Sequence, residues 1–194
     1  YDDHGHLLGE CDLVIEVVVE LLSIKQKVFD WVAQNRRPGA IVASNTSGLS
    51  LAEMADSMNP EMREHFLVMH FFNPVRYMRL LELVGSEHTD PEVLRAVASF
   101  GEEVLGKGIV YGKDTPNFIA NRVGIFGIGS VLRHQQRLGL GVEEVDLLFG
   151  QAMGRPHKGV FGLADLVGLD VLLHAQKTVY DGCPEDEERD AFSS

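Results

Sequence analysis

The residue types best suited to chemistry in this sequence are the histidine and glutamate of the segment HFFNPVRYMRLLELV, at positions 70–84. His70 ends one apolar run, Asn73-Pro74 predicts a turn, and Glu82 lies in the next apolar run. Two strands joined by a short connection can place His70 beside Glu82. A neighbouring carboxylate fixes the tautomer of an imidazole and stabilises the imidazolium, so this pair could act as a general acid/base near neutral pH. The pattern alone leaves open a histidine that ends a strand and an unrelated surface glutamate.

The segments around this pair predict an α/β domain. Apolar, β-branched runs at residues 12–19 and 40–44 are typical of parallel strands covered on both faces. A helix is expected from Glu20 to Asn35, and a shorter one after the capping-box sequence Ser50 to Glu53. The apolar stripe of the longer helix consists of Leu21, Ile24, Val28 and Val32. Strands at 65–72, 79–84 and 107–111 and a helix from 90 to about 105 complete a doubly wound, Rossmann-type pattern.

The character of the sequence changes after Asp114. Helices are expected at 117–138, 142–153 and 161–180, with glycine-rich breaks and no competing strand pattern. The sequence therefore predicts an α/β domain over residues 1–113 and an all-α domain over residues 114–194. The glycines of the first of these helices follow no strand, so they are expected to allow close helix packing rather than to bind phosphate; they are Gly124, Gly127 and Gly129. A charged, solvated or frayed tail is expected at 184–190.

The composition is that of a globular protein with an excess of acid. Among 194 residues, 17 basic and 29 acidic side chains give a net charge of −12, which argues against nucleic acid as a partner. No apolar run reaches membrane-spanning length or forms a secretory signal. The distant Cys11 and Cys183 predict reduced thiols and a cytoplasmic protein. No metal is expected, because the histidines do not cluster and His4 and His6 lie in an end expected to be frayed.

The glycine-rich element of a nucleotide-binding domain is not found. Such a domain normally opens with a strand, a glycine-rich turn and a helix that hold the pyrophosphate. No such element occurs in these 194 residues. The sequence therefore predicts the second half of a nucleotide-binding domain, followed by part of a helical one.

Together these segments resemble the L-3-hydroxyacyl-CoA dehydrogenase family of fatty-acid β-oxidation. The matching phrases are DLVIEVVVELLSIKQKVF, ASNTSGLS, HFFNPV followed by LELV, KDTPNFIANR and ADLVGLD, in the family's order and approximate spacing. The resemblance covers nearly the whole chain. It implies an NAD-dependent oxidation of a 3-hydroxyacyl-CoA to the 3-oxoacyl-CoA, and a chain that is incomplete at both ends.

The resemblance also implies catalytic roles. His70 would be the acid/base that removes the hydroxyl proton while hydride leaves C3, and Glu82 would hold and support it. Ser47 would contact substrate and cofactor, and Asn121 would form a hydrogen bond near the reacting oxygen. From the residues alone, Ser47 could be a turn or helix-cap serine and Asn121 a helix residue that bonds locally.

For the cofactor, the resemblance places Glu20 near a ribose of NAD, with Lys25 in the same site and Ser47 and Asn73 beside it. The carboxyl end of a strand is where a doubly wound sheet binds ligands, which suits Glu20. The residue after this glutamate is Leu21, where the family usually has asparagine. The alternative for Lys25 is an exposed helix lysine without a cofactor role.

The helical domain is expected to form a homodimer, as it does in the family, because it has more apolar side chains than a small domain readily buries. These are Phe126, Ile128, Val131, Leu132, Leu147, Leu148 and Phe149. Ordinary packing within the chain is the alternative. Two other functions remain open: a non-catalytic fragment or relative that serves as an acyl-CoA-binding or dimerisation module, and another β-hydroxyacid oxidoreductase of the same layout. The presence of His70 and Glu82 argues against the first, and against versions of the second that use a lysine base.

Overall fold

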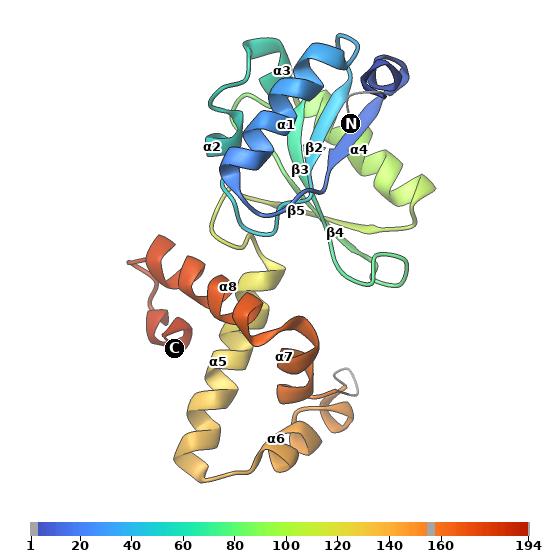
Figure 1. The fold of residues 1–194 in the computed structure, drawn as a ribbon. Helices are drawn as coiled ribbons and strands as arrows, with labels where there is room; N and C mark the ends of the chain where they lie inside the picture. Colours follow the sequence, from blue (N-terminus) through green and yellow to red (C-terminus); the bar gives the residue numbers. More distant parts are fainter. Residues whose placement is uncertain (1–3, 155–157, 194) are drawn as a thin grey trace. The chain divides into compact units, whose positions relative to one another are not determined.

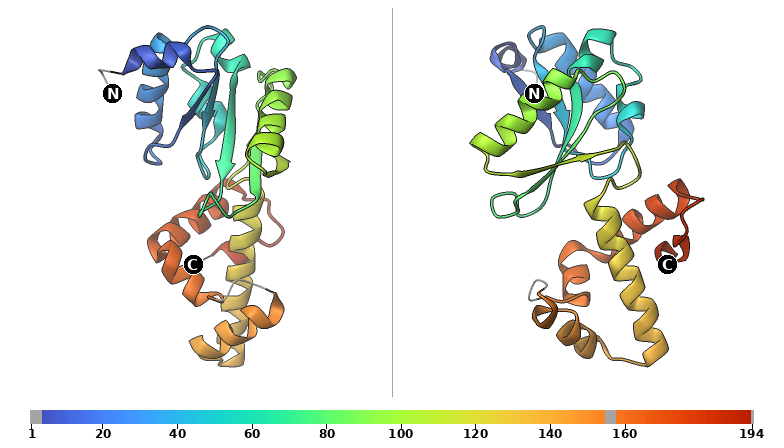
Figure 2. Two further views of the ribbon diagram at one scale, coloured as in Figure 1. Left: turned by 90° about the vertical axis from the view of Figure 1, so that its right-hand side faces the viewer. Right: turned by 180° about the vertical axis from the view of Figure 1, so that it is seen from behind.

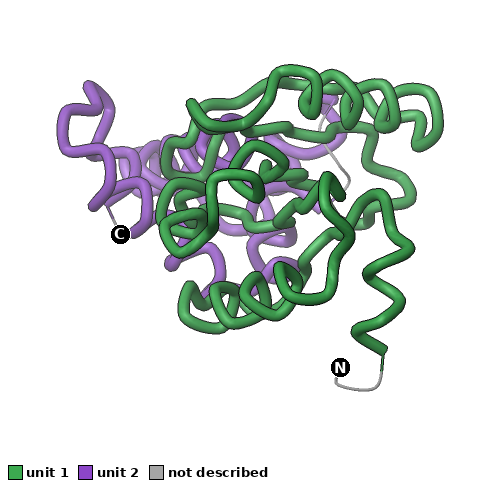
Figure 3. The backbone as a smooth tube through the Cα atoms, turned by 90° about the horizontal axis from the view of Figure 1, so that it is seen from above, with its two compact units in different colours: residues 1–118 green, residues 119–194 purple. Residues whose placement is uncertain are grey.

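The computed structural model describes residues 4–154 and 158–193 and divides the chain into two compact units. Residues 1–118 form an α/β unit and residues 119–194 form a helical unit, drawn in two colours in Figure 3. The predicted fold class, α/β followed by all-α, is confirmed. The finer domain limits of 1–113 and 114–194 stay a prediction.

The α/β unit is built on one five-stranded sheet with the order β1-β2-β3-β4-β5 (Figure 1). β1, β2 and β3 run parallel, β4 is antiparallel to β3, and β5 is parallel to β4. The direction reverses at β4 because its connection from β3 is short, whereas parallel neighbours need a longer crossover. The strands are β1 (Leu13–Glu16), β2 (Ile41–Ser44), β3 (Phe66–Phe71), β4 (Leu80–Val84) and β5 (Gly108–Gly112).

Helices cover both faces of this sheet, as the side view in Figure 2 shows. Side chains alternate between the faces, so even-numbered strand residues such as Val42 and Val68 pack toward α1, and odd-numbered ones such as Leu67 and Met69 pack toward α4. The first face is covered by α1 (Leu22–Asn35), α2 (Leu51–Ala55) and α3 (Pro60–Glu64). The second is covered by α4 (Pro91–Ser99), which continues as a π-helical turn, Phe100–Val104.

This alternation gathers polar residues on one face. Glu16, Ser44, His70 and Glu82 are all even-numbered strand residues, and all four are buried. Glu16 pairs with Ser44 in the β1–β2 register, and His70 pairs with Glu82 in the β3–β4 register. The period of two therefore turns their side chains to the α1 face of the sheet.

The helical unit consists of four helices and two 3₁₀ turns among the described residues. A Cβ built at Gly129 would lie 1.9 Å from the carbonyl oxygen of Ala191, so the close packing predicted for the helix glycines holds there; at Gly124 nothing lies within 4 Å. Of the apolar residues predicted to be in excess, Leu147 is 76% exposed, whereas Ile128 and Val131 are buried. The elements are α5 (Ala120–Leu138), α6 (Val142–Leu148), α7 (Phe161–Val167), α8 (Leu169–Gly182), Gln151–Met153 and Arg189–Phe192.

The apolar stripe predicted for α1 is confirmed for Val28 and Val32, which pack in the core, and wrong for Leu21 and Ile24. The buried residues of α1 are Lys25, Phe29 and Val32, whereas Leu21 and Ile24 are 56% and 37% exposed. A pattern that counts only apolar side chains cannot place a lysine in the core, because it does not include the buried carboxylate that Lys25 meets.

Several predicted boundaries also differ. The strand expected to reach residue 19 ends at Glu16, whose side chain accepts the N–H of Val18. The helix expected from 117 begins at Ala120, because residues 117 and 118 have φ of 59° and 49°, outside helical values. The helix expected over 161–180 is two helices with a break at Gly168, where φ is 99°.

Both ends of the described chain are more ordered than predicted. The segment Gly5–Glu10, expected to be frayed, is a 3₁₀ helix. In the tail, Asp186 forms an ion pair with Arg122, and Arg189 donates to the carbonyl of Tyr180. These contacts explain why the tail is not frayed, although most of its side chains are exposed.

Candidate active site

The histidine and the glutamate singled out from the sequence lie side by side. The β3–β4 register places His70 directly opposite Glu82, and Nδ1 of His70 lies 2.6 Å from Oε2 of Glu82. His70 is 3% exposed and Glu82 is fully buried. A short contact to a buried carboxylate fixes which ring nitrogen faces the protein. Nδ1 therefore faces the carboxylate, and Nε2 is the nitrogen that can meet a substrate.

The imidazole ring is held by aromatic side chains as well. The ring centroid of Phe72 lies 4.4 Å from that of His70, and the centroid of Phe118 lies 5.7 Å away. Within the described chain, Nε2 of His70 makes no hydrogen bond. A ring fixed in orientation, with one nitrogen unengaged, has the geometry required of a positioned acid/base.

A second group of predicted residues meets where β1 and β2 end. One oxygen of Glu20 accepts hydrogen bonds from the Thr46 hydroxyl and from the Ser47 amide, the latter at 2.9 Å. The other oxygen lies 3.2 Å from Nζ of Lys25. Burial alone would raise the pKa of the Glu20 carboxyl, but the bonds from Thr46 and Ser47 and the charge of Lys25 outweigh it and hold the pKa below its usual value. Glu20 is thus a fixed anion, and its side chain is 36% exposed.

Lys25 is buried rather than exposed, so the alternative of a surface lysine is wrong. Its Nζ lies 2.9 Å from each carboxylate oxygen of Glu16, and its side chain is 1% exposed. Glu16 also accepts hydrogen bonds from the Ser44 hydroxyl at 2.6 Å and from the Val18 amide at 2.5 Å. Sequence reasoning missed Glu16, Ser44 and Thr46. The sequence signal that could have identified Glu16 was an acidic residue at the end of an apolar strand.

The remaining predicted residues have fewer contacts within their units. Asn73 is exposed in the β3–β4 connection. Asn121 is half-buried in the first turn of α5 and belongs to the helical unit. Asn45, which directly follows β2, was not singled out from the sequence. Its side chain accepts the N–H of Phe71 at 2.9 Å and so ties the end of β2 to β3.

The surface around Glu20 fits a nucleoside. Ribose hydroxyls need an acceptor, and the flat rings attached to a ribose need apolar surface. Glu20 supplies the acceptor, and Val17 and Val19 beside it are 70% and 58% exposed. The residues present therefore suit the ribose portion of NAD, at the carboxyl edge of the parallel strands.

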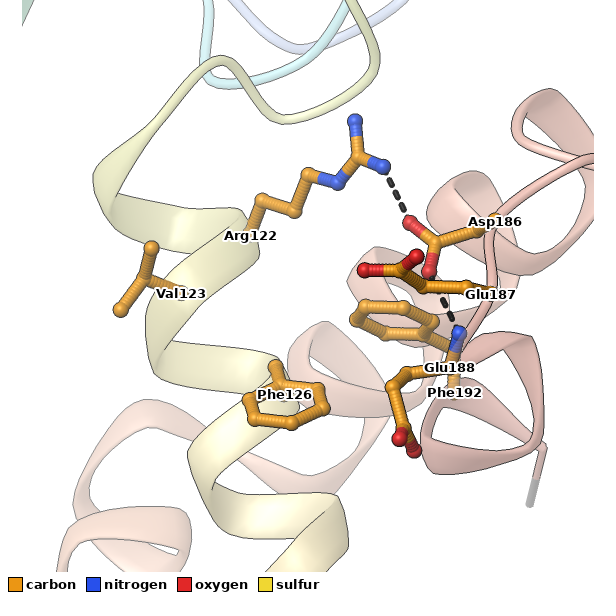
Figure 4. A pocket seen from close by; sticks show the side chains of 7 residues that line it. All are labelled: Arg122, Val123, Phe126, Asp186, Glu187, Glu188 and Phe192. Atoms are coloured by element: carbon orange, nitrogen blue, oxygen red, sulfur yellow. Dashed lines mark hydrogen bonds and ion pairs between the residues drawn. The ribbon is translucent and has the colours of Figure 1, made fainter.

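Two hollows elsewhere in the molecule are lined by residues other than the predicted site residues. One of about 270 Å³ lies within the helical unit, and one of about 420 Å³ lies within the α/β unit between α2 and residues 85–88. Figure 4 shows the first, where Arg122 points toward Asp186 above two phenylalanine rings. It is lined by Arg122, Val123, Phe126, Asp186, Glu187, Glu188 and Phe192.

Residues 4–154 and 158–193 lack two further features. No helix there is long and apolar enough to cross a membrane. No group of three or more histidine, cysteine or acidic side chains there could hold a metal ion.

Family models match almost the whole chain. Residues 1–115 match the NAD binding domain of 3-hydroxyacyl-CoA dehydrogenase, and residues 118–193 match its C-terminal domain. The chain therefore belongs to the 3-hydroxyacyl-CoA dehydrogenase family, as the sequence motifs predicted. The match supports NAD as the cofactor and assigns the chain to a family of oxidoreductases.

Individual relatives agree with this assignment. A probable 3-hydroxyacyl-CoA dehydrogenase from Bacillus subtilis is 47% identical over 96% of this chain and 24% of its own length. A putative fatty acid oxidation complex trifunctional enzyme from Rickettsia prowazekii is 38% identical over 94% of this chain and 25% of its own. The crystal structure of (S)-3-hydroxybutyryl-CoA dehydrogenase from Ralstonia eutropha matches with a TM-score of 0.86 and 29% identity, over 95% of this chain and 64% of that one. The chain thus spans about a quarter of the length of these two curated relatives.

Proposed function

We propose that this chain is the part of an NAD-dependent 3-hydroxyacyl-CoA dehydrogenase that holds its acid/base pair. The enzyme would oxidise an L-3-hydroxyacyl-CoA to the 3-oxoacyl-CoA in fatty-acid β-oxidation. The buried pair of His70 and Glu82, in a chain of this family, is the observation on which the proposal rests. The name of the Rickettsia relative supports the place in fatty-acid oxidation.

In this proposal His70 accepts the proton of the substrate's 3-hydroxyl group at Nε2. As the O–H bond breaks, its electrons form the carbonyl at C3. Glu82, which faces Nδ1, stabilises the imidazolium that results. NAD, when bound, supplies the acceptor for the hydride that leaves C3.

The other residues have supporting roles in this proposal. Glu20 accepts hydrogen bonds from a ribose, Ser47 and Asn73 line the cofactor side, and Lys25 belongs to the same site. Asn121 donates to the reacting oxygen, where a fixed donor stabilises developing charge. The contacts among Glu20, Lys25 and Ser47 support the first group. The role of Asn121 rests on the family motif alone.

The acyl-CoA-binding or dimerisation module is the less favoured alternative. Burying a carboxylate costs free energy unless the charge is paired. A relative that had lost catalysis would therefore not be expected to keep a carboxylate buried against a histidine. Both members of the pair are present, in contact and buried. This favours the enzyme.

We further propose a homodimer formed through the helical unit. Several large apolar side chains of that unit are more than half exposed, among them Val123, Leu147 and Leu169. Exposed apolar surface of this kind marks interaction sites. Sedimentation at micromolar concentration should give twice the chain mass, and a monomer at every concentration would exclude the dimer. A cytoplasmic location stays a prediction.

Substitution of His70 tests the enzymatic proposal. His70→Ala should lower kcat for acetoacetyl-CoA reduction by at least the roughly 10²–10⁴-fold of general acid–base catalysis, with little change in NADH binding. His88→Ala is the matched control, because His88 lies in the same unit and its side chain is 52% exposed. Turnover in His70→Ala close to that of the control would contradict the assignment.

A further inference from the structure

We propose that Phe118 is a positioning residue for His70, and that residues 114–118 form a strained connection that holds the Phe118 ring in place. This inference rests on the proposed role of His70 as the acid/base. It assigns functions to Asp114 and Phe118, two residues near the end of the α/β unit.

Phe118 supplies part of the packing around the imidazole of His70. Its side chain is 2% exposed, and its ring centroid lies 5.7 Å from that of the imidazole, at an interplanar angle of 57°. It belongs to the same core cluster as Leu51 of α2 and Val68 of β3. The contact with Glu82 fixes only one atom of the imidazole, Nδ1, so packing against the ring is what fixes the direction of Nε2.

The backbone that presents Phe118 is strained. Residues 117 and 118 have φ of 59° and 49°, in the left-handed region, which is uncommon for asparagine and rarer for an aromatic residue. The turn is closed by the Phe118 amide, which donates to the carbonyl of Thr115 at 2.9 Å. Such a conformation persists only where the surrounding structure holds it, and strain of this kind concentrates at functional sites. Here it directs a buried ring to His70.

Asp114 anchors this connection to α2. One carboxylate oxygen accepts the Leu51 amide at 2.9 Å, and the other accepts the Ser50 hydroxyl at 2.9 Å and the Ala52 amide at 3.0 Å. The amides of a first helical turn have no acceptor within the helix, so a carboxylate beside them is stabilising. The connection is thereby fixed four residues before Phe118.

A second contact holds the middle of the connection. A Cβ built at Gly48 would lie 2.5 Å from the side-chain oxygen of Asn117, so a side chain at Gly48 would displace that of Asn117. Asn117 is itself 3% exposed. The connection is therefore held at Asp114, at Asn117 and at the buried ring of Phe118, and these contacts maintain the left-handed turn.

A purely structural role for Phe118 predicts a different result. Truncation of a residue that only fills the core lowers the free energy of unfolding but leaves kcat of the folded molecules unchanged. Truncation of a positioning residue lowers kcat as well, because Nε2 of His70 is no longer held toward the substrate. Phe29 provides the comparison, because it is 1% exposed in the same core cluster and its ring packs against that of Phe66, 5.0 Å away.

The test compares Phe118→Leu with Phe29→Leu in the reduction of acetoacetyl-CoA by NADH. Both variants replace a buried ring by a smaller apolar side chain. Phe118→Leu should lower kcat about 10- to 100-fold, the cost of a misplacement of about 1 Å, whereas Phe29→Leu should leave kcat per folded molecule within about twofold. Circular dichroism gives the folded fraction of each variant. Equal kcat values in the two variants would overturn the proposal.

Asp114→Asn tests the anchor without altering the core. The amide loses the charge and one of the two acceptor oxygens, so kcat should fall about threefold. Asp56→Asn is the control, because Asp56 is exposed at the C-terminal end of the same helix. In a Phe118→Leu background, Asp114→Asn should change kcat by less than about twofold, because the ring that Asp114 positions is already absent. A kcat equal to that of the control, or the full loss in that background, would overturn the proposed anchor.

A measurement without cofactor separates this inference from the proposed function. The proton between Nδ1 of His70 and Glu82 should give a protected downfield resonance, because the contact is short and buried. Phe118→Leu should broaden this resonance or speed its exchange with solvent, and Phe29→Leu should not. If the parent chain shows this difference but reduces no acetoacetyl-CoA, the proposed function fails and the positioning of His70 stands. A resonance that is unchanged in Phe118→Leu would overturn the positioning.

Discussion

The α/β unit buries two pairs of side chains on one face of its sheet, each with one basic and one acidic member. The two pairs differ in how their basic groups are hydrogen-bonded. In one, the Lys25 ammonium is surrounded by acceptors from Glu16, Glu20 and the backbone. In the other, His70 meets Glu82 through Nδ1 alone, and its Nε2 makes no hydrogen bond to the described residues. The first arrangement can only hold a charge in place, whereas the second can accept and return a proton. Burial and pairing alone therefore do not distinguish the two pairs, whereas the unengaged titratable atom of the second pair does.

The largest expected effect comes from neutralising the carboxylate of the second pair. Glu82→Gln keeps the size of the side chain but removes the charge that stabilises the imidazolium, so kcat should fall by about 10²–10⁴-fold. Steady-state assays of acetoacetyl-CoA reduction measure this. Glu87→Gln, at a side chain that is 88% exposed, should leave kcat unchanged. A Glu82→Gln variant within threefold of the parent would remove the distinction between the two pairs.

The next effect is on stability at the first pair. Lys25→Met leaves the Glu16 carboxylate buried without its partner and should lower the free energy of unfolding by about 3–5 kcal/mol. Urea denaturation measures it, and addition of Glu16→Gln should recover part of the loss. Lys27→Met, at an exposed position of the same helix, should change stability by less than about 0.5 kcal/mol. If Lys25→Met lowers the free energy of unfolding no more than this control does, the ion pair does not stabilise the start of α1.

A smaller gain is expected where α1 begins. Its N-cap is Leu21, which makes no side-chain hydrogen bond to the helix and is 56% exposed. Leu21→Asn should supply an acceptor for the Ser23 amide in the first turn and raise the free energy of unfolding by about 0.5–1 kcal/mol. Thermal unfolding measures this gain. A loss of stability on this substitution would show that the Leu21 side chain makes stabilising contacts other than those described.

The smallest expected effect concerns pH. The pKa of Glu20 is lowered in the folded chain from its usual value of 4.5, so its contribution to stability is present above that value and is lost as pH falls through the folded value. The difference in unfolding free energy between the parent chain and Glu20→Gln should therefore be constant near neutral pH and shrink below about pH 4.5. A difference that grows on acidification would contradict the sign of the shift.

The sequence predicted those features that depend on local pattern. Apolar runs and turn residues located the strands, and the short connection after His70 indicated that Glu82 would lie beside it. The pattern could not show that Lys25 turns inward, because its partner ends a different element. Thr46 was missed for the same reason, since its role depends on Glu20, which follows the neighbouring strand β1. The role of Asn121 also depends on distant residues, so the sequence offers only its family motif.

The ladder between β3 and β4 has a consequence for how such a protein can vary. The separation of His70 and Glu82 is set by hydrogen bonds between directly opposed strand residues, and not by the residues that connect the strands. Insertions or substitutions at positions 75–79 can therefore accumulate without moving the pair, provided that the register is kept. A slip of one residue, by contrast, would turn the side chains of one strand to the opposite face and separate the pair. The connecting residues can therefore vary in sequence and length, while the register of the sheet keeps the distance between the two side chains constant.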